Sequence, residues 1–193
     1  MSFAKKMGRE QKRRNKHFEA LAEYSAKKGA SARRQVVHAE SRQYIAELRQ
    51  KAEVISYTLT LFLASVHARF GFGKKRLQKL DDKIFSHYDC IKSKLVTVSD
   101  IDKILLEEGK LDIRKKINKP DTNKAHKIED ELISCFFIAL MDGFGFKSKR
   151  LSEAYLAVVN VADAVNNKEL STDDLIQALI KAKYLNKDGK KAA

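Results

Sequence analysis

Two short segments of this 193-residue chain place lysines and arginines next to phenylalanine and glycine. Residues 70–77 read FGFGKKRL and residues 144–151 read FGFKSKRL; we call these segments corner 1 and corner 2. In each corner we expect one helix to end at Phe-Gly-Phe and the next helix to begin among the cations. The N–H groups and the dipole at such a helix start can hold an anion, for example a phosphate. The corner residues that we expect to contact phosphate are Lys74, Lys75, Arg76, Lys149 and Arg150.

The placement of these cations is unusual for a helix. A lysine or arginine in the first turn is disfavoured by about 0.3 to 1 kcal/mol, because the dipole is positive there. Both corners break this local rule in the same way, which favours a function, since such violations tend to persist at functional sites. A simpler explanation stays open: the side chains can extend into water, and duplication can copy a feature without a function. Neither corner matches a P-loop GxxxxGK[ST] or a dinucleotide-binding GxGxxG motif.

The first 53 residues form a second basic region, with 14 Lys or Arg against six Glu. Together with the net charge of +14 for the whole chain, this predicts attraction to a polyanion, with nucleic acid as the first choice. A solvated helix face is the other explanation for such charges. If roughly six phosphates were neutralised, affinity would fall by about three decades between low and physiological salt. The expected contacts in this arm are Lys12, Arg13, Arg14, Arg33, Arg34 and Arg42.

Residue patterns typical of enzymes and metal sites are missing from the sequence. Among the five histidines, only His87 has a cysteine, Cys90, at helical spacing, and two ligands do not make a zinc site. The sequence contains no GxSxG and no HExxH motif. We therefore expect no catalytic activity, no cofactor and no metal. Cys90 and Cys135 are expected to be buried thiols in a reducing cytosol.

The corners belong to a longer internal repeat with a constant offset of 74 residues. Outside the corners, Phe62 matches Phe136 and Asp100 matches Asp174 in the same register. A match that extends this far without a gap indicates a tandem duplication rather than chance. A unit of roughly 57 residues is near the lower limit for independent folding, so we expect the two copies to pack on each other.

Apolar periodicity predicts an all-α protein. An apolar seam from Val37 to Val66 predicts one long helix, and residues 74–91 predict the central helix of the first copy. A hydroxyl followed three residues later by Asp predicts a capping box at Thr97 and at Ser171. The predicted organisation is a basic N-terminal helical arm followed by a tandem duplication of a three-helix unit. The predicted boundaries are 1–53 for the arm, 54–113 for repeat 1, 114–128 for a linker, 129–187 for repeat 2 and 188–193 for a basic tail that we expect to fray.

The long helix also carries apolar residues that nothing in the remaining sequence is obliged to cover: Val37, Tyr44 and Leu48. They favour a second hypothesis, an inhibitor or adaptor that docks on a host enzyme or a ribonucleoprotein. A virion structural protein is a third hypothesis, and a homodimer through the arm fits all three. No window approaches 18 uncharged apolar residues, and no apolar stretch follows the basic N-terminus, so we expect neither membrane spanning nor secretion.

The motif FGFGKKRL at residues 70–77, which returns less fully at residues 144–151 with Lys147 in place of the second glycine, resembles a unit of small phage and prophage proteins of low-GC Gram-positive bacteria. The resemblance covers the two repeats and not the first 53 residues. It implies a mobile-element context and a site of action in the cytoplasm of a bacterial host, and it brings no catalytic residues with it. Our leading expectation is a non-enzymatic protein, nucleic-acid-binding or regulatory, that contacts the phosphates of DNA or RNA.

Overall fold

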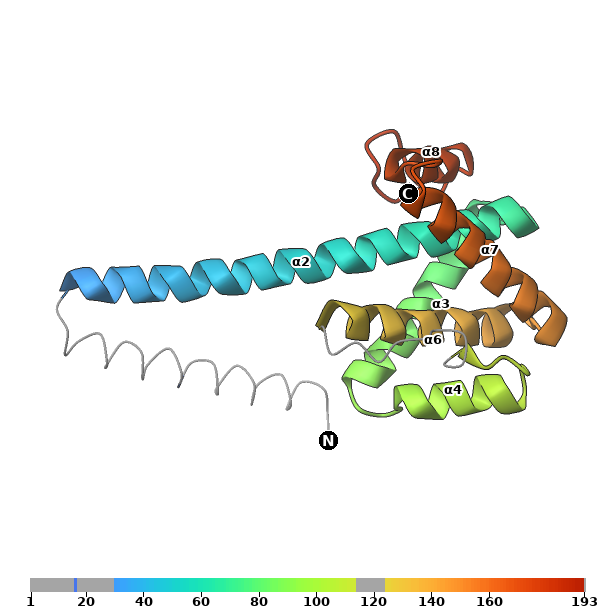
Figure 1. Ribbon diagram of the computed structural model, residues 1–193, viewed down its shortest axis with the longest axis horizontal. Helices are drawn as coiled ribbons and strands as arrows, with labels where there is room; N and C mark the ends of the chain where they lie inside the picture. The colour runs from blue at the N-terminus through green and yellow to red at the C-terminus, as the bar shows by residue number, and fades with distance from the viewer. Residues whose placement is uncertain (1–15, 17–29, 114–123, 193) are drawn as a thin grey trace. The chain divides into compact units, whose positions relative to one another are not determined.

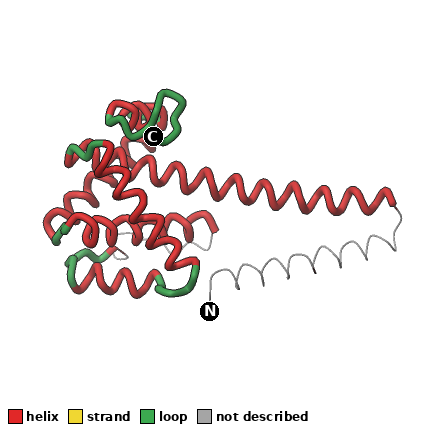
Figure 2. Tube along the Cα trace, turned by 180° about the vertical axis from the view of Figure 1, so that it is seen from behind, coloured by secondary structure: helices red, strands yellow, loops and turns green. Residues whose placement is uncertain are grey.

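The computed structural model describes residue 16 and residues 30–113 and 124–192, with side-chain detail from residue 41 in the first range and from residue 127 in the second. The described part of the chain is all-α, as the periodicity predicts. Its helices are α2 (Ala30–Phe70), α3 (Lys74–Lys92), α4 (Val98–Glu107), α6 (Lys124–Phe144), α7 (Ser148–Asn166) and α8 (Thr172–Lys181). Short loops connect α2 to α3, α3 to α4, α6 to α7 and α7 to α8 (Figures 1 and 2). In the described ranges, no helix has the length and apolar character that crossing a bilayer requires.

The chain divides into an N-terminal segment, Met1–Ala52, and a body, Glu53–Ala193. The division falls within α2, one residue from the boundary drawn at 53 from the sequence. The predicted linker, 114–128, is too long at its C-terminal end, because α6 already begins at Lys124. The sequence predicts a linker that extends to residue 128 because the Pro-Asp-Thr-Asn run before Lys124 is typical of a turn.

The body contains one hydrophobic core to which both predicted repeats contribute. The rings of Phe62 on α2 and Phe136 on α6, which match in the repeat, are stacked with their centroids 4.5 Å apart. Phe136 and Phe137 are fully buried, and α3 and α4 pack on α6. The two predicted repeats therefore share one core, as a unit of this size needs in order to bury enough apolar surface.

The two corners adopt the same backbone geometry. Gly71 has a φ of +65° and Gly145 a φ of +64°, the left-handed region that glycine enters without a Cβ clash. Their N–H groups close the last turns of α2 and α6 on the carbonyl oxygens of His67 (2.9 Å) and Met141 (3.0 Å). The residue after each glycine, Phe72 or Phe146, is only 2% exposed and anchors its corner in the core.

The element bounds recur at the spacing of the sequence repeat. Helices α7 and α8 begin and end 74 residues after α3 and α4, and α6 ends 74 residues after α2. Each central helix is also followed by a lysine with positive φ, 56° at Lys94 and 62° at Lys168. The shared geometry extends to the capping residues, which the sequence predicts at the starts of α4 and α8.

Capping boxes close α4 and α8 at their N-termini, as predicted. Thr97 accepts from the N–H of Asp100, and the Asp100 carboxylate accepts from the N–H of Thr97 at 2.9 Å. Ser171 and Asp174 repeat this arrangement with the same 2.9 Å bond. The side-chain hydrogen bonds from Thr97 and Ser171 hold the pKa of Asp100 and Asp174 below their usual range.

Removal of these caps gives a first testable outcome. Thr97→Ala and Ser171→Ala are each expected to lower the free energy of unfolding by about 1 kcal/mol at neutral pH. Because the carboxyl pKa is lower in the folded state, the cap contribution is present above the ordinary carboxyl pKa of about 3.9 and is lost as pH falls through the folded value. Urea unfolding at several pH values should therefore show a weaker acid dependence in the double variant. Ser86→Ala, at an exposed position in α3, is the control; an equal loss there would contradict the capping account.

The C-terminal residues correct the expectation of a frayed basic tail. Leu185 and Lys191 form an isolated antiparallel bridge, and the N–H of Ala192 donates to the carbonyl oxygen of Tyr184 at 2.9 Å. Asp81 on α3, almost fully buried, accepts from the Tyr184 hydroxyl at 2.7 Å and pairs with the ammonium of Lys191. A buried carboxylate requires such partners, so residues 188–192 are part of the folded body.

Candidate nucleic-acid interface

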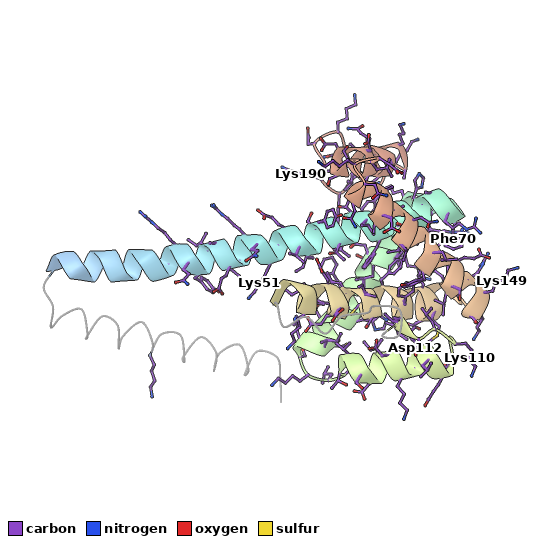
Figure 3. All side chains as sticks on the ribbon, viewed as in Figure 1. Lys51, Phe70, Lys110, Asp112, Lys149 and Lys190 are labelled. Carbon is purple, nitrogen blue, oxygen red and sulfur yellow. The ribbon has the colours of Figure 1, made fainter. Side chains whose placement is uncertain are left out.

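The two corners contact each other through their phenylalanines. The ring of Phe70 in corner 1 lies 5.0 Å from that of Phe146 in corner 2, in an edge-to-face arrangement. The ring of Phe72 lies 4.9 Å from that of Phe144 and 6.2 Å from that of Phe146. Aromatic pairs at these distances stabilise one another beyond the area they bury. The ends of α2 and α6 and the starts of α3 and α7 therefore meet at one place, where Figure 3 labels Phe70 and Lys149.

The cations surround this aromatic cluster. The guanidinium carbon of Arg76 lies 5.7 Å from the centroid of Phe72, and that of Arg150 lies 5.2 Å from the centroid of Phe146. These matched cation–π contacts orient the two arginines. Lys75, Lys149 and both arginines are exposed, whereas Lys74 is half-buried. Four of the five predicted corner cations thus present their charge to solvent around one aromatic cluster.

The helices that start at the corners are not capped by a side chain. Gly73 is the N-cap of α3 and Lys147 is the N-cap of α7, and neither α3 nor α7 has an acidic residue in its first turn. By contrast, α4 and α8 carry full capping boxes with Asp100 and Asp174. Helices α4 and α8 begin with an acidic residue in the first turn, whereas α3 and α7 carry Lys and Arg there. The corners therefore combine N-terminal N–H groups, the positive dipole end and Lys or Arg side chains.

Two of the carboxylates near the corners, those of Glu153 and Asp142, are engaged by other cations. Glu153 accepts from Arg69 at 3.2 Å, and Asp142 accepts from Lys83 at 2.7 Å. The hydrogen bond from Lys83 holds the pKa of Asp142 below its usual range, so Asp142 is charged at neutral pH. Within the described part of the chain, no ion pair neutralises the four exposed corner cations: Lys75, Arg76, Lys149 and Arg150.

A groove runs along α3 from corner 1. It has a volume of about 470 Å³ and is lined by Lys75, Gln78, Lys79, Asp82, Lys83 and Ser86. Lys79 lies over the ring of Phe144 and donates to the carbonyl oxygen of Gly143 at 2.9 Å, and Lys83 is paired with Asp142. Of the three groove lysines, Lys75 is the one that extends the corner charge into the groove.

The structure describes the side chains of only some of the contact residues predicted in the arm. Lys12, Arg13 and Arg14 lie outside the described residues, and Arg33, Arg34 and Val37 lie on α2 in the stretch whose side chains are outside the description. Arg42 is exposed on α2. Tyr44 and Leu48 are exposed by 43% and 46%, and Ile45 beside them by 47%.

Sequence reasoning overlooked three basic residues at the corners: Arg69, Lys79 and Lys147. Lys147 is the exposed N-cap of α7, and its signal was available as the residue that replaces the second glycine of corner 1. Arg69 donates to Glu153 and Lys79 donates to the carbonyl oxygen of Gly143, each in the other predicted repeat, a relation that only the tertiary structure reveals. With them, residues 69–79 and 143–153 carry eight Lys or Arg and one Glu.

The thiol of Cys135 and the imidazole of His87 are two other side chains with chemical reactivity, and both lie against the core. Burial raises the pKa of the Cys135 thiol to about 12, so it stays protonated at neutral pH. His87 has its Nε2 buried without a hydrogen-bond partner among the described residues, 3.6 Å from a carboxylate oxygen of Asp142. Burial lowers the pKa of His87, although Asp142 opposes this. Cys135 is fully buried and His87 is partly buried, whereas the corner cations Lys75, Arg76, Lys149 and Arg150 are exposed.

The arrangement at the corners suits an extended polyanion. Each corner provides a helix start and cations with long side chains, and the phenylalanine cluster holds the two corners together. Phosphates are well matched to such a surface because they accept from both N–H groups and cationic side chains. Comparison of the chain with protein-family models, curated proteins and solved structures found no match.

Proposed function

We propose that this chain is a non-enzymatic nucleic-acid-binding protein that contacts phosphates through its two corners and its basic arm. The observation that supports the proposal is the meeting of the corners at one aromatic cluster. It brings together residues 69–79 and 143–153, which carry eight Lys or Arg and one Glu, with Asp142 next to the second segment paired to Lys83. Phosphate neutralisation releases counterions and supplies most of the affinity in sequence-independent binding. The arm adds 14 Lys or Arg against six Glu.

The chemistry of the surface favours weak sequence specificity. Lys and Arg contacts to phosphate position a protein on nucleic acid, whereas base edges in the grooves carry the sequence information. The described helices include no recognition-helix motif by which bases would be read. Together with the resemblance of the corners to phage and prophage proteins, this favours a regulatory protein of a mobile element that acts in the host cytoplasm.

Binding in solution tests the proposal. Fluorescence anisotropy with labelled DNA and RNA at about 50 mM salt should show saturable binding, with affinity falling steeply as salt rises to about 200 mM. Arg33→Glu with Arg34→Glu is expected to weaken binding and to reduce the salt dependence, because two phosphate contacts are lost. The absence of binding to any DNA or RNA at the lower salt would refute the proposed function.

A second candidate function is binding to a host protein through α2. Tyr44, Ile45 and Leu48 are adjacent on this helix and each is more than 40% exposed, which favours a protein contact over a purely solvated face. Tyr44→Ser with Leu48→Ser should abolish capture of such a partner from host lysate and leave binding to purified nucleic acid unchanged. Capture that survives nuclease treatment and is lost in this variant would favour the protein-binding function.

A further inference from the structure

We infer that the two corners form a single surface that binds one nucleic-acid duplex, with corner 1 on the backbone of one strand and corner 2 on the backbone of the other. This inference rests on the proposed function and deepens it in two respects, the number of ligands and their strandedness.

Contacts between the corners occur in exchanged pairs. In the repeat, Phe70 corresponds to Phe144 and Phe72 corresponds to Phe146. Phe70 contacts Phe146 with a centroid distance of 5.0 Å, and the corresponding pair, Phe144 and Phe72, has a centroid distance of 4.9 Å. Arg69 corresponds to Gly143 and Lys79 corresponds to Glu153 in the same way. Arg69 contacts Glu153, and the corresponding residues, Gly143 and Lys79, also contact each other. Phe62 and Phe136 contact each other and exchange places. Such exchange is the mark of an isologous contact about an approximate two-fold axis.

The cations of the two corners are close enough to share one ligand. The guanidinium carbon of Arg76 lies 5.7 Å from the centroid of Phe72, and that of Arg150 lies 5.2 Å from the centroid of Phe146. Because the two ring centroids are 6.2 Å apart, the two guanidinium carbons are at most about 17 Å apart. Grooves of a B-form duplex are about 6 and 12 Å wide, and their edges are the two backbones. One guanidinium can therefore reach each side of a single groove.

Symmetry favours a duplex over a single strand. The backbones of a duplex are related by two-fold axes, which is why two-fold symmetric proteins place equivalent residues on its two strands. The corners offer equivalent cations at matched positions, Lys75 and Arg76 in one and Lys149 and Arg150 in the other. A single strand has one backbone and no such axis, so it can engage the two corners only in unequal ways.

Two ligands on this surface would repel each other. Each would be a polyanion bound by one corner, and the guanidinium carbons of the two corners are at most about 17 Å apart. Screening at about 0.1 M salt acts over roughly 10 Å, and at 0.01 M over about 30 Å, so at low salt the second ligand would meet the field of the first. One ligand that neutralises both corners avoids this cost.

The test compares two variants that remove one corner each. K75E/R76E removes corner 1 and K149E/R150E removes corner 2, and K94E/K168E makes the same change in charge at the exposed lysines after the other ends of α3 and α7. The probes are a duplex DNA and a duplex RNA of about 12 base pairs, just over one helical turn, and one DNA strand of the same length. Stoichiometry is measured by analytical ultracentrifugation and affinity by anisotropy at about 50 mM salt.

We expect one duplex per chain, a preference for duplex over single strand, and a loss of affinity of more than about tenfold in either corner variant with the stoichiometry unchanged. The control variant should bind within about threefold of the original chain. Two duplexes per chain, with one corner variant retaining one tight site, would overturn the inference and leave the proposed function standing. Equal or tighter binding of the single strand would overturn it as well. Binding of none of the probes would refute the proposed function itself.

Discussion

Charge reversal at both corners, K75E/R76E/K149E/R150E, is expected to weaken nucleic-acid binding by more than about a hundredfold at ~0.1 M salt. The four side chains are exposed, and no described ion pair engages them, so their charge is available to phosphate. Four lost phosphate contacts should also reduce the slope of log affinity against log salt by about 3.6. Anisotropy titrations at several salt concentrations measure both quantities.

The charge change at the two lysines should not destabilise the fold. Lys75 and Lys149 lie in the first turns of α3 and α7, where an acidic residue is favoured by about 0.3 to 1 kcal/mol. The simpler variant K75E/K149E is therefore expected to bind more weakly and to unfold at a slightly higher temperature. The control K94E/K168E should retain binding and gain no stability, since acids are unfavourable after a helix C-terminus. Unchanged affinity in the corner variants, or an equal loss in the control, would contradict the account.

Replacing Phe136 with alanine is expected to cost about 3 to 5 kcal/mol of unfolding free energy, the largest stability effect that we predict. The side chain is fully buried, stacks on Phe62 at 4.5 Å and meets the ring of Phe137 at 5.0 Å. Its removal leaves a cavity between α2 and α6 that the remaining rings cannot fill. Urea unfolding at neutral pH measures the loss, and Leu156→Ala, at a position 56% exposed on α7, should change stability by less than about 0.5 kcal/mol.

A double-mutant cycle shows whether the two copies depend on each other. If Phe62 and Phe136 stabilise each other, the combined variant should be less destabilised than the sum of the single variants, by about 0.5 to 1.5 kcal/mol. Additivity within about 0.3 kcal/mol would mean that the two rings act independently, contrary to the shared core. The cycle therefore examines the packing that holds the corners together.

Much of the local structure could be predicted from the sequence because local rules determine it. The apolar seam from Val37 to Val66 predicts a helix from residues three or four apart. The glycines of the corners and the hydroxyl–Asp pairs at Thr97 and Ser171 likewise act over a few residues. The structure confirms the long helix α2, the ends of α2 and α6 at the corners and both capping boxes. The duplication stays a prediction, although the element bounds keep its offset.

The rest depends on contacts between residues distant in sequence. Repetition of a corner does not reveal that its phenylalanines pack against those of the other corner, so the meeting of the two cation sets could not be predicted. The sequence predicts that the basic C-terminal end frays. In the structure, the buried carboxylate of Asp81 holds this end by accepting from the hydroxyl of Tyr184, 103 residues later in the chain, and by pairing with Lys191. Nothing local marks Asp81 as buried, because its neighbour Asp82 is exposed.

The most direct test of the central claim is an NMR titration of the isotope-labelled chain with a duplex of about 12 base pairs. If the two corners form one phosphate-binding surface, the backbone amide signals of residues 74–77 and 148–151 should shift together, follow one binding curve and saturate at one duplex per chain. Shifts confined to one corner, or two separate curves, would contradict a single surface. Movement of no corner signal while the duplex binds elsewhere would contradict the corners as the site altogether.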